Sequence, residues 1–280
     1  MKTFFTKTKL IAASMVFGLA AASSVNAATI TFGGQVASDN SGKTSTKIDA
    51  SNIINDVSLG YFVETFDAAT AIPAFPSANN TAYNVAGAST GCSINSPLVI
   101  TQSNSGILNV RNGSVSKVAA APANDQTCYG YTTPAGGAPN FVDIDYTAFL
   151  GSIGGAVPAL AGSYIDYLGF YWGSVDTYNS FEFYSNNVLV KQITGTELLA
   201  ELGGSSGDQV SDKSNVYVNI DFTPAESFNR FRVITSGIAG EFDNIVVGLN
   251  KRPVTVPAPT GLAILGLGLL GLGLGRRLKK

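Results

Sequence analysis

Short runs of β-branched and aromatic residues, separated by turn residues, occupy most of the chain between residues 57 and 247. Such runs are typical of β-strands. Residues 215–222 show the clearest alternation: Val216, Val218, Ile220 and Phe222 share one face, and polar residues fill much of the other. This pattern predicts half-buried antiparallel strands. The strands are expected at residues 57–66, 107–111, 141–146, 164–172, 181–184, 188–193, 216–222, 228–234 and 241–247.

Local signals mark a hairpin and one helix. Ser185, Asn186 and Asn187 separate two strand-like runs, which indicates a tight turn. Thr194 and Glu197 have the spacing of a capping box, and a Gly-Gly pair after residue 202 ends the helix. Many short strands with one short helix predict an all-β fold, a jelly-roll-like β-sandwich, over residues 28–250.

The N-terminus has the pattern of a secretory signal peptide. Three lysines precede an apolar stretch at residues 10–22, and small residues lie at the −3 and −1 positions of a cleavage site between Ala27 and Ala28. We therefore expect residues 1–27 to be removed on export, with an uncleaved anchor as the alternative. The two cysteines, Cys92 and Cys128, are expected to form a disulfide in an exported protein. Two separate buried thiols are the alternative.

The C-terminus combines a short proline motif, an apolar segment and a basic end. The motif is Val256, Pro257, Ala258 and Pro259; residues 260–275 contain no charge, and residues 276–280 carry four basic side chains. A helix over residues 260–275 would reach roughly 24 Å, slightly less than a hydrocarbon core of about 30 Å. The basic end predicts that the tail stays cytoplasmic while the body lies outside. An ordinary membrane anchor would explain these features.

The segment at residues 251–280 also resembles the PEP-CTERM sorting domain of Gram-negative bacteria, on the proline motif, the Gly/Leu helix and the basic end. That resemblance implies export through the Sec translocon, an inner-membrane intermediate, recognition and cleavage by an exosortase, and transfer to the cell surface or the exopolysaccharide matrix. The usual glutamate between the prolines is Ala258 here, which leaves open whether cleavage occurs. Residues 164–247 are similar to exosortase-dependent surface proteins with a lectin-like sandwich.

Composition excludes several classes of function. The chain has no histidine, so catalysis by a Ser-His-Asp or Cys-His set in the usual form is excluded. Of the 17 Lys and Arg residues, three lie in the signal segment and four in the last five residues, so ten remain in the body against all 19 acidic residues. A net charge of about −9 argues against binding to nucleic acid or to anionic lipid.

Carboxylates supply the remaining candidate sites. Glu64 and Asp243 lie near the first and last substantial strands, and carbohydrate-binding jelly rolls often hold a structural calcium with an early Glu and a late Asp. This resemblance implies a Ca²⁺ site at Glu64 and Asp243, with Asp67 as a third ligand. Two unrelated exposed carboxylates are the alternative. Asp143 and Asp145 point to one face of a strand, as a glycosidase pair would, or as a solvated strand face would.

The segment from Trp172 to Asn179 holds the only tryptophan of the chain beside Asp176 and Tyr178. An aromatic platform with polar neighbours suits a sugar, and a core tryptophan next to a polar turn is the alternative. We therefore expect a non-enzymatic surface or matrix protein associated with exopolysaccharide. A carbohydrate-binding module with a calcium is the second hypothesis, and a carboxylate-based glycosidase is the third.

Overall fold

The computed structural model describes residues 28–54, 56–67, 91–92, 94, 98–104, 106–134 and 140–251. The signal segment up to Ala27, and the sorting motif with its predicted helix and basic tail, lie outside these residues. Within the described part of the chain, no helix is long and apolar enough to cross a membrane.

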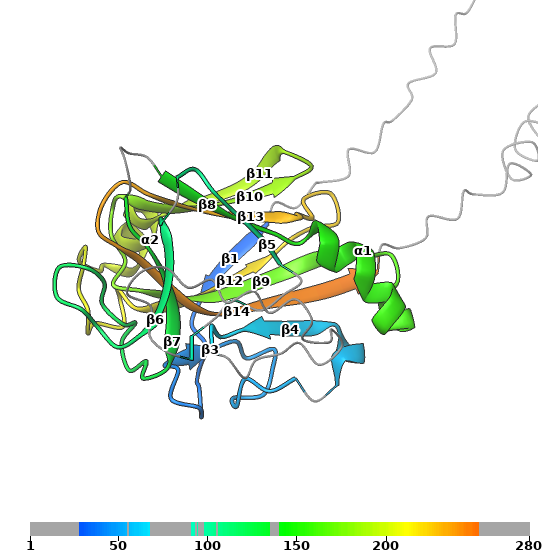
Figure 1. Ribbon diagram of the computed structural model, residues 1–280, viewed down its shortest axis with the longest axis horizontal. Helices are drawn as coiled ribbons and strands as arrows, with labels where there is room; N and C mark the ends of the chain where they lie inside the picture. Colours follow the sequence, from blue (N-terminus) through cyan, green and yellow to red (C-terminus); the bar gives the residue numbers. More distant parts are fainter. Residues whose placement is uncertain are drawn as a thin grey trace, which may run out of the picture.

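Two antiparallel sheets pack face to face (Figure 1), so the predicted all-β sandwich is confirmed at this level. In the described residues, the seven-stranded sheet has the order β1 (Thr29–Phe32), β12 (Val216–Asp221), β9 (Ser163–Gly173), β14 (Gly240–Lys251), β7 (Cys128–Thr132) and β6 (Leu108–Asn112), and β4 (Tyr61–Glu64) also pairs with β14. The five-stranded sheet has the order β11 (Val188–Thr194), β10 (Asn179–Ser185), β13 (Arg230–Thr235), β8 (Asn140–Asp145) and β5 (Val99–Gln102).

Aromatic side chains from both sheets fill the space between them. Phe170 on β9 lies 4.4 Å from Phe181 on β10 and 5.6 Å from Phe231 on β13, measured between ring centroids. Trp172 and Phe242 from the seven-stranded sheet join the same cluster. Pairs at these separations add about 0.5–1.5 kcal/mol each beyond the burial of their area.

The hairpin and the second helix form as their local signals predict. Ser185 pairs with Val188, so Asn186 and Asn187 alone make the turn, and both have positive φ. Helix α2 (Gly195–Leu202) begins with a complete capping box, in which the Thr194 side chain accepts from the main-chain N–H of Glu197. It ends at Gly203 in the left-handed conformation.

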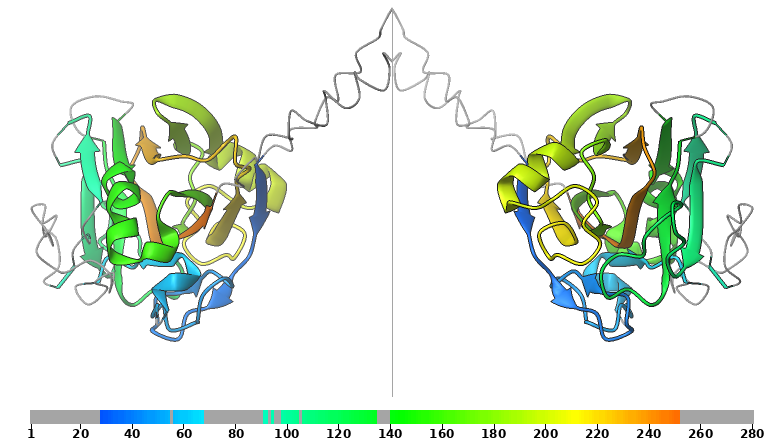
Figure 2. Two further views of the ribbon diagram at one scale, coloured as in Figure 1. Left: turned by 90° about the vertical axis from the view of Figure 1, so that its right-hand side faces the viewer. Right: turned by 90° about the vertical axis from the view of Figure 1, so that its left-hand side faces the viewer.

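Some elements differ from prediction. Residues 57–59 form a 3₁₀ turn, η1 (Val57–Leu59), and β4 follows it. Helix α1 (Thr147–Ala156) was not expected; it is followed by a second 3₁₀ turn, η3 (Pro158–Leu160). The two α-helices lie at opposite ends of the sandwich (Figure 2).

The outer face of the seven-stranded sheet is also covered. A small ribbon, β2 (Gln35–Val36) and β3 (Lys43–Thr44), packs there with its connecting segments. Tyr217 on β12 is fully buried although it points away from the main core, and it donates to the main-chain carbonyl of Asn244 at 3.0 Å. The ribbon therefore creates a second, more polar interior against the outer face of the sheet.

Candidate functional site

A polar pocket of about 490 Å³ lies beside the start of β14. The segment at residues 114–120 forms one wall, and the turn after β9 forms another. Its polar and charged lining includes Ser114, Lys117, Ser174, Asp176, Tyr178, Gln209 and Glu241. Concave sites of this size, with a few convergent polar groups, are the usual places for small ligands.

Glu241 forms the floor of the pocket and is 2% exposed. Its Oε1 accepts the main-chain N–H of Ala120 at 3.0 Å, and its Oε2 accepts the hydroxyl of Ser174 at 2.7 Å. Burial raises the pKa of Glu241 to about 7, and the charge of Asp176 adds to the rise, while the two hydrogen bonds oppose it. The titration of Glu241 is therefore shifted upward toward neutral pH.

Asp176 and Tyr178 lie at the side of the same pocket. Asp176 Oδ2 accepts from the hydroxyl of Tyr178 at 2.6 Å, and Oδ1 accepts from the hydroxyl of Ser206 at 2.8 Å. The Tyr178 hydroxyl also lies against the carbonyl of Ile238, so its single proton has two competing acceptors. Burial, together with the neighbouring Asp176, raises the pKa of Tyr178. Tyr178 is half-buried and lines the pocket.

The other two residues of the predicted sugar-binding segment are structural. Trp172 is fully buried between the sheets, with its ring centroid 4.5 Å from that of Phe181, so its predicted role as a sugar platform is wrong. Asn179 is 2% exposed; its Nδ2 donates to the carbonyl of Ala239, and its Oδ1 accepts from Thr235. Asn179 therefore supports the pocket wall and offers it no free amide.

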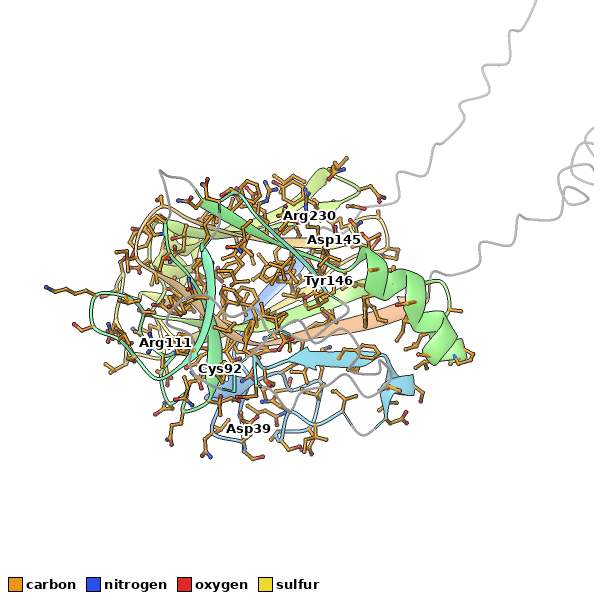
Figure 3. The ribbon with its side chains drawn as sticks, viewed as in Figure 1. Asp39, Cys92, Arg111, Asp145, Tyr146 and Arg230 are labelled. Atoms are coloured by element: carbon orange, nitrogen blue, oxygen red, sulfur yellow. A yellow bond between two sulfur atoms is a disulfide. The ribbon has the colours of Figure 1, made fainter. Side chains whose placement is uncertain are left out.

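The predicted disulfide is confirmed. Cys92 and Cys128 are bonded, with their Cα atoms 5.5 Å apart. Cys128 begins β7, and its main-chain N–H donates to Asp67 Oδ1 at 3.1 Å. The bond therefore ties the segment around residue 92 to β7, the strand next to the edge strand β6 of the seven-stranded sheet. Figure 3 shows Cys92 near this edge, with Asp39 below it.

The predicted pairing of Glu64 with Asp243 at a calcium site is wrong. Glu64 lies opposite Ile245, a core residue, and lines a small apolar cavity with Tyr146. Asp243 follows Phe242, whose side chain is in the main core, so Asp243 points to the outer face of the sheet. The two carboxylates therefore lie on opposite faces. Burial, the charge of Asp125 and the charge of Asp67 all raise the pKa of Asp243.

Asp143 and Asp145 share a strand face, as predicted, but their partners argue against a catalytic pair. Asp143 is 5% exposed, and Arg232 binds both of its oxygens at 2.6 and 2.8 Å. Arg230 lies 3.5 Å from the same carboxylate. Asp145 accepts the N–H of Thr147 at the start of α1. Figure 3 shows Asp145 and Arg230 close together on the five-stranded sheet.

Sequence reasoning found Asp176 and Tyr178 but missed Glu241 and the segment at residues 114–120. Glu241 lies next to the core residue Phe242 in the sequence, but nothing there reveals that a loop more than 100 residues earlier closes over it. No protein-family model, curated protein or solved structure shows a significant match to this chain.

Proposed function

We propose that this protein is an exported, non-enzymatic surface or matrix protein that binds neutral carbohydrate in the pocket of Asp176, Tyr178 and Glu241. The observation that carries the proposal is the pocket itself, which combines a half-buried tyrosine ring with carboxylate and hydroxyl groups. Sugars present apolar C–H faces and many hydroxyls, which suit such a lining. The acidic body favours a neutral polysaccharide over an anionic one because like charges repel.

The terminal signals support the location. A signal peptide before Ala28 and a PEP-CTERM-like segment at residues 251–280 would send the body to the cell surface or the extracellular matrix of a Gram-negative bacterium. The jelly-roll-like arrangement belongs to the same proposal, since antiparallel sandwiches of this kind include lectin domains.

The test of binding is retention on neutral exopolysaccharide or its oligosaccharides. Asp176→Asn keeps the shape of the pocket but removes the charged acceptor, and it should weaken binding by roughly tenfold, the effect of about 1.4 kcal/mol for a hydrogen bond to a charged group. Asp212→Asn is the matched control, because Asp212 is 78% exposed and outside the pocket. Equal retention of both variants and the wild type would rule out this pocket.

The test of location is the intact mass of the protein from producing cells with and without the exosortase. Two-ended processing predicts a mature chain that starts near Ala28 and ends near Pro257. A chain that still ends at Lys280 in both cells would make the protein membrane-anchored, with Ala258 as the reason that sorting fails.

Glycoside hydrolysis is the second candidate, and the pKa of Glu241 near 7 favours it. A carboxyl group that exchanges its proton near neutral pH is suited to general acid catalysis, and Asp176 would be the second carboxylate. Release of reducing ends from the bound polysaccharide would support this function, provided that Glu241→Gln abolishes it. Binding without release supports the non-enzymatic function.

A further inference from the structure

A second group of buried acids lies outside the pocket, between the seven-stranded sheet and the segment that covers its outer face. Asp243 on β14 is fully buried, and no hydrogen bond of ordinary geometry reaches either of its oxygens, although the N–H of Asn244 is near enough to oppose the rise in its pKa. Asp125 is 7% exposed; Thr127 donates twice to its Oδ1, but its Oδ2 accepts nothing. Buried carboxylate oxygens without donors are costly, so they require a physical explanation.

No basic side chain of the described residues forms an ion pair with these two acids. The ion pairs in this part of the chain join Lys43 to Asp212, Lys47 to Asp221, and both Arg230 and Arg232 to Asp143. Nearby negative charge increases the cost. Burial raises the pKa of Asp125 to about 6, with Asp67 adding to the rise, and burial and Asp125 raise that of Asp243.

An amide oxygen at the same junction also lacks a donor. Asn52 is 2% exposed and has positive φ. Its Nδ2 lies 2.7 Å from Asp39 Oδ2, 2.9 Å from Ser41 Oγ and 3.1 Å from Asn244 Oδ1. Its two hydrogens therefore face three acceptors, which fixes the orientation of the amide. The Oδ1 of Asn52 accepts nothing. This oxygen is neutral, so protonation of the acids would not satisfy it, and it still requires a donor or a cation.

The surrounding main chain holds the three residues together. Asn244, next to Asp243, donates to the carbonyls of Ser41 and Lys43 at 3.0 and 2.9 Å. Ser41 forms a β-bridge with Asp125. The segments that carry Asn52, Asp125 and Asp243 therefore meet at one place, through contacts that do not depend on the carboxylates themselves.

We propose that Asp125, Asp243 and Asn52 bind one calcium ion on the outer face of the seven-stranded sheet. Ca²⁺ takes six to eight oxygen ligands in flexible geometry, which suits carboxylates, an amide and main-chain carbonyls. No three His, Cys, Asp or Glu side chains of the described residues are grouped closely enough to hold a metal. Neutral oxygens, including Asn52 Oδ1 and water, therefore complete the coordination. This set excludes Glu64 and shares no residue with the proposed carbohydrate site.

The test measures metal binding directly, with the protein first freed of metal by a chelator. Tb³⁺ replaces Ca²⁺ at such sites, and Tyr171 lies opposite Asp243 in the sheet, so excitation of tyrosine should give terbium emission that Ca²⁺ displaces. Calorimetric titration with Ca²⁺ should give one site per chain. Asp243→Asn and Asp125→Asn should each lower the affinity at least tenfold, whereas Asp212→Asn, a change of the same charge at an exposed position, should not.

Thermal unfolding supplies a second readout, because Asp243→Asn should shift the Tm in opposite directions in chelator and in Ca²⁺. At Ca²⁺ a hundredfold above its Kd, the Tm of the wild type should rise by roughly 5–10 °C. In chelator near pH 7.5, Asp243→Asn should melt above the wild type, since it replaces a carboxyl group whose ionisation burial makes unfavourable. In Ca²⁺ the order should reverse. If Asp243→Asn does not fold, Asp125→Asn supplies the same comparison.

The competing explanation is a proton shared between Asp125 and Asp243. It predicts no terbium emission, no heat with Ca²⁺ and the same Tm in Ca²⁺ and in chelator, and those results together would overturn the proposal. An equal rise in Tm with Mg²⁺ or with sodium chloride would also overturn it, because it would indicate general charge screening. Loss of carbohydrate retention alone, with calcium binding intact, refutes only the proposed function.

Discussion

Glu241→Gln gives the sharpest test of the pocket. The amide replaces the carboxyl group with little change of shape, and both of its partners can be kept. Its oxygen accepts the N–H of Ala120 as Oε1 does now, and its Nε2 donates to the hydroxyl oxygen of Ser174, which is an acceptor as well as a donor. The substitution therefore removes the titration of Glu241 and keeps both neighbours in contact, although the Ser174 hydroxyl proton loses its carboxylate acceptor. That loss does not depend on pH, so it does not affect the change of stability with pH.

The expected magnitude follows from the pKa. Burial raises the pKa of Glu241 from an ordinary value near 4.5 to about 7. Folding therefore favours the protonated form, and the folded state holds a proton between these two pH values that the unfolded state has lost. The contribution to stability is fully present below about pH 4.5 and is lost as the pH rises to about 7. At 1.36 kcal/mol per pH unit, the loss is about 3 kcal/mol.

The assay is urea unfolding of the wild type and of Glu241→Gln at pH values from 4 to 8.5. Asp125 and Asp243 also have raised pKa values, so the difference between the two proteins is the quantity to compare, because it cancels their titration. Between pH 4.5 and pH 7.5, the free energy of unfolding of the variant should rise by about 3 kcal/mol relative to that of the wild type. Glu201→Gln, at an exposed position on α2, is the control. A difference for Glu241→Gln that does not change with pH would refute the reasoning.

Three further predictions concern stability and are checked by the same unfolding measurement near pH 7. Replacing Cys92 and Cys128 by serine should lower the free energy of unfolding by about 3–4 kcal/mol in the chain-entropy model, because the bond closes a loop with a sequence separation of 36; equal stability of the oxidised and reduced proteins would contradict this. Asp143→Asn should cost about 3 kcal/mol because it leaves the largely buried Arg232 without a full ionic partner, and a cost below 1 kcal/mol would show that the guanidinium is well solvated. Thr194→Ala should cost about 1 kcal/mol through loss of the α2 cap, whereas Thr196→Ala, inside the same helix, should cost less.

The elements predicted correctly are those whose signals are local. The two-residue turn at Asn186 and Asn187 and the α2 capping box each depend on residues a few positions apart. Helix α1 has no such signal: its N-cap is Tyr146, which makes no side-chain capping bond, and its sequence contains several glycines. Its main-chain start is instead held by Asp145, a residue that the sequence suggested for another role.

The error at Glu64 and Asp243 has a specific structural cause. A strict two-residue alternation through residues 241–247 would put Asp243 and Ile245 on one face. Asn244 has positive φ, and the pairing of β14 with β9 shifts register after Asp243, so Ile245 turns to the core while Asp243 stays outside. One bulge residue thus moves the partner of Glu64 to the opposite face. Alternation alone does not reveal such a bulge.

The segment at residues 114–127 physically connects the two candidate sites. Its Ala120 binds Glu241 in the pocket, and its Asp125 faces Asp243, two positions further along β14. Between them, Ala123 donates to Asn215 and accepts from Tyr171. A cation held by Asp125 and Asp243 would anchor one end of this segment and so fix the wall of the pocket at the other. Glu241 and Asp243 both have raised pKa values, so the ionisation of each destabilises the fold as the pH rises. Both oxygens of Glu241 accept hydrogen bonds, whereas the unpaired oxygens of Asp243 can bind a cation. Removal of calcium should therefore loosen the pocket wall before it unfolds the sandwich, which hydrogen exchange at Ala120 would detect.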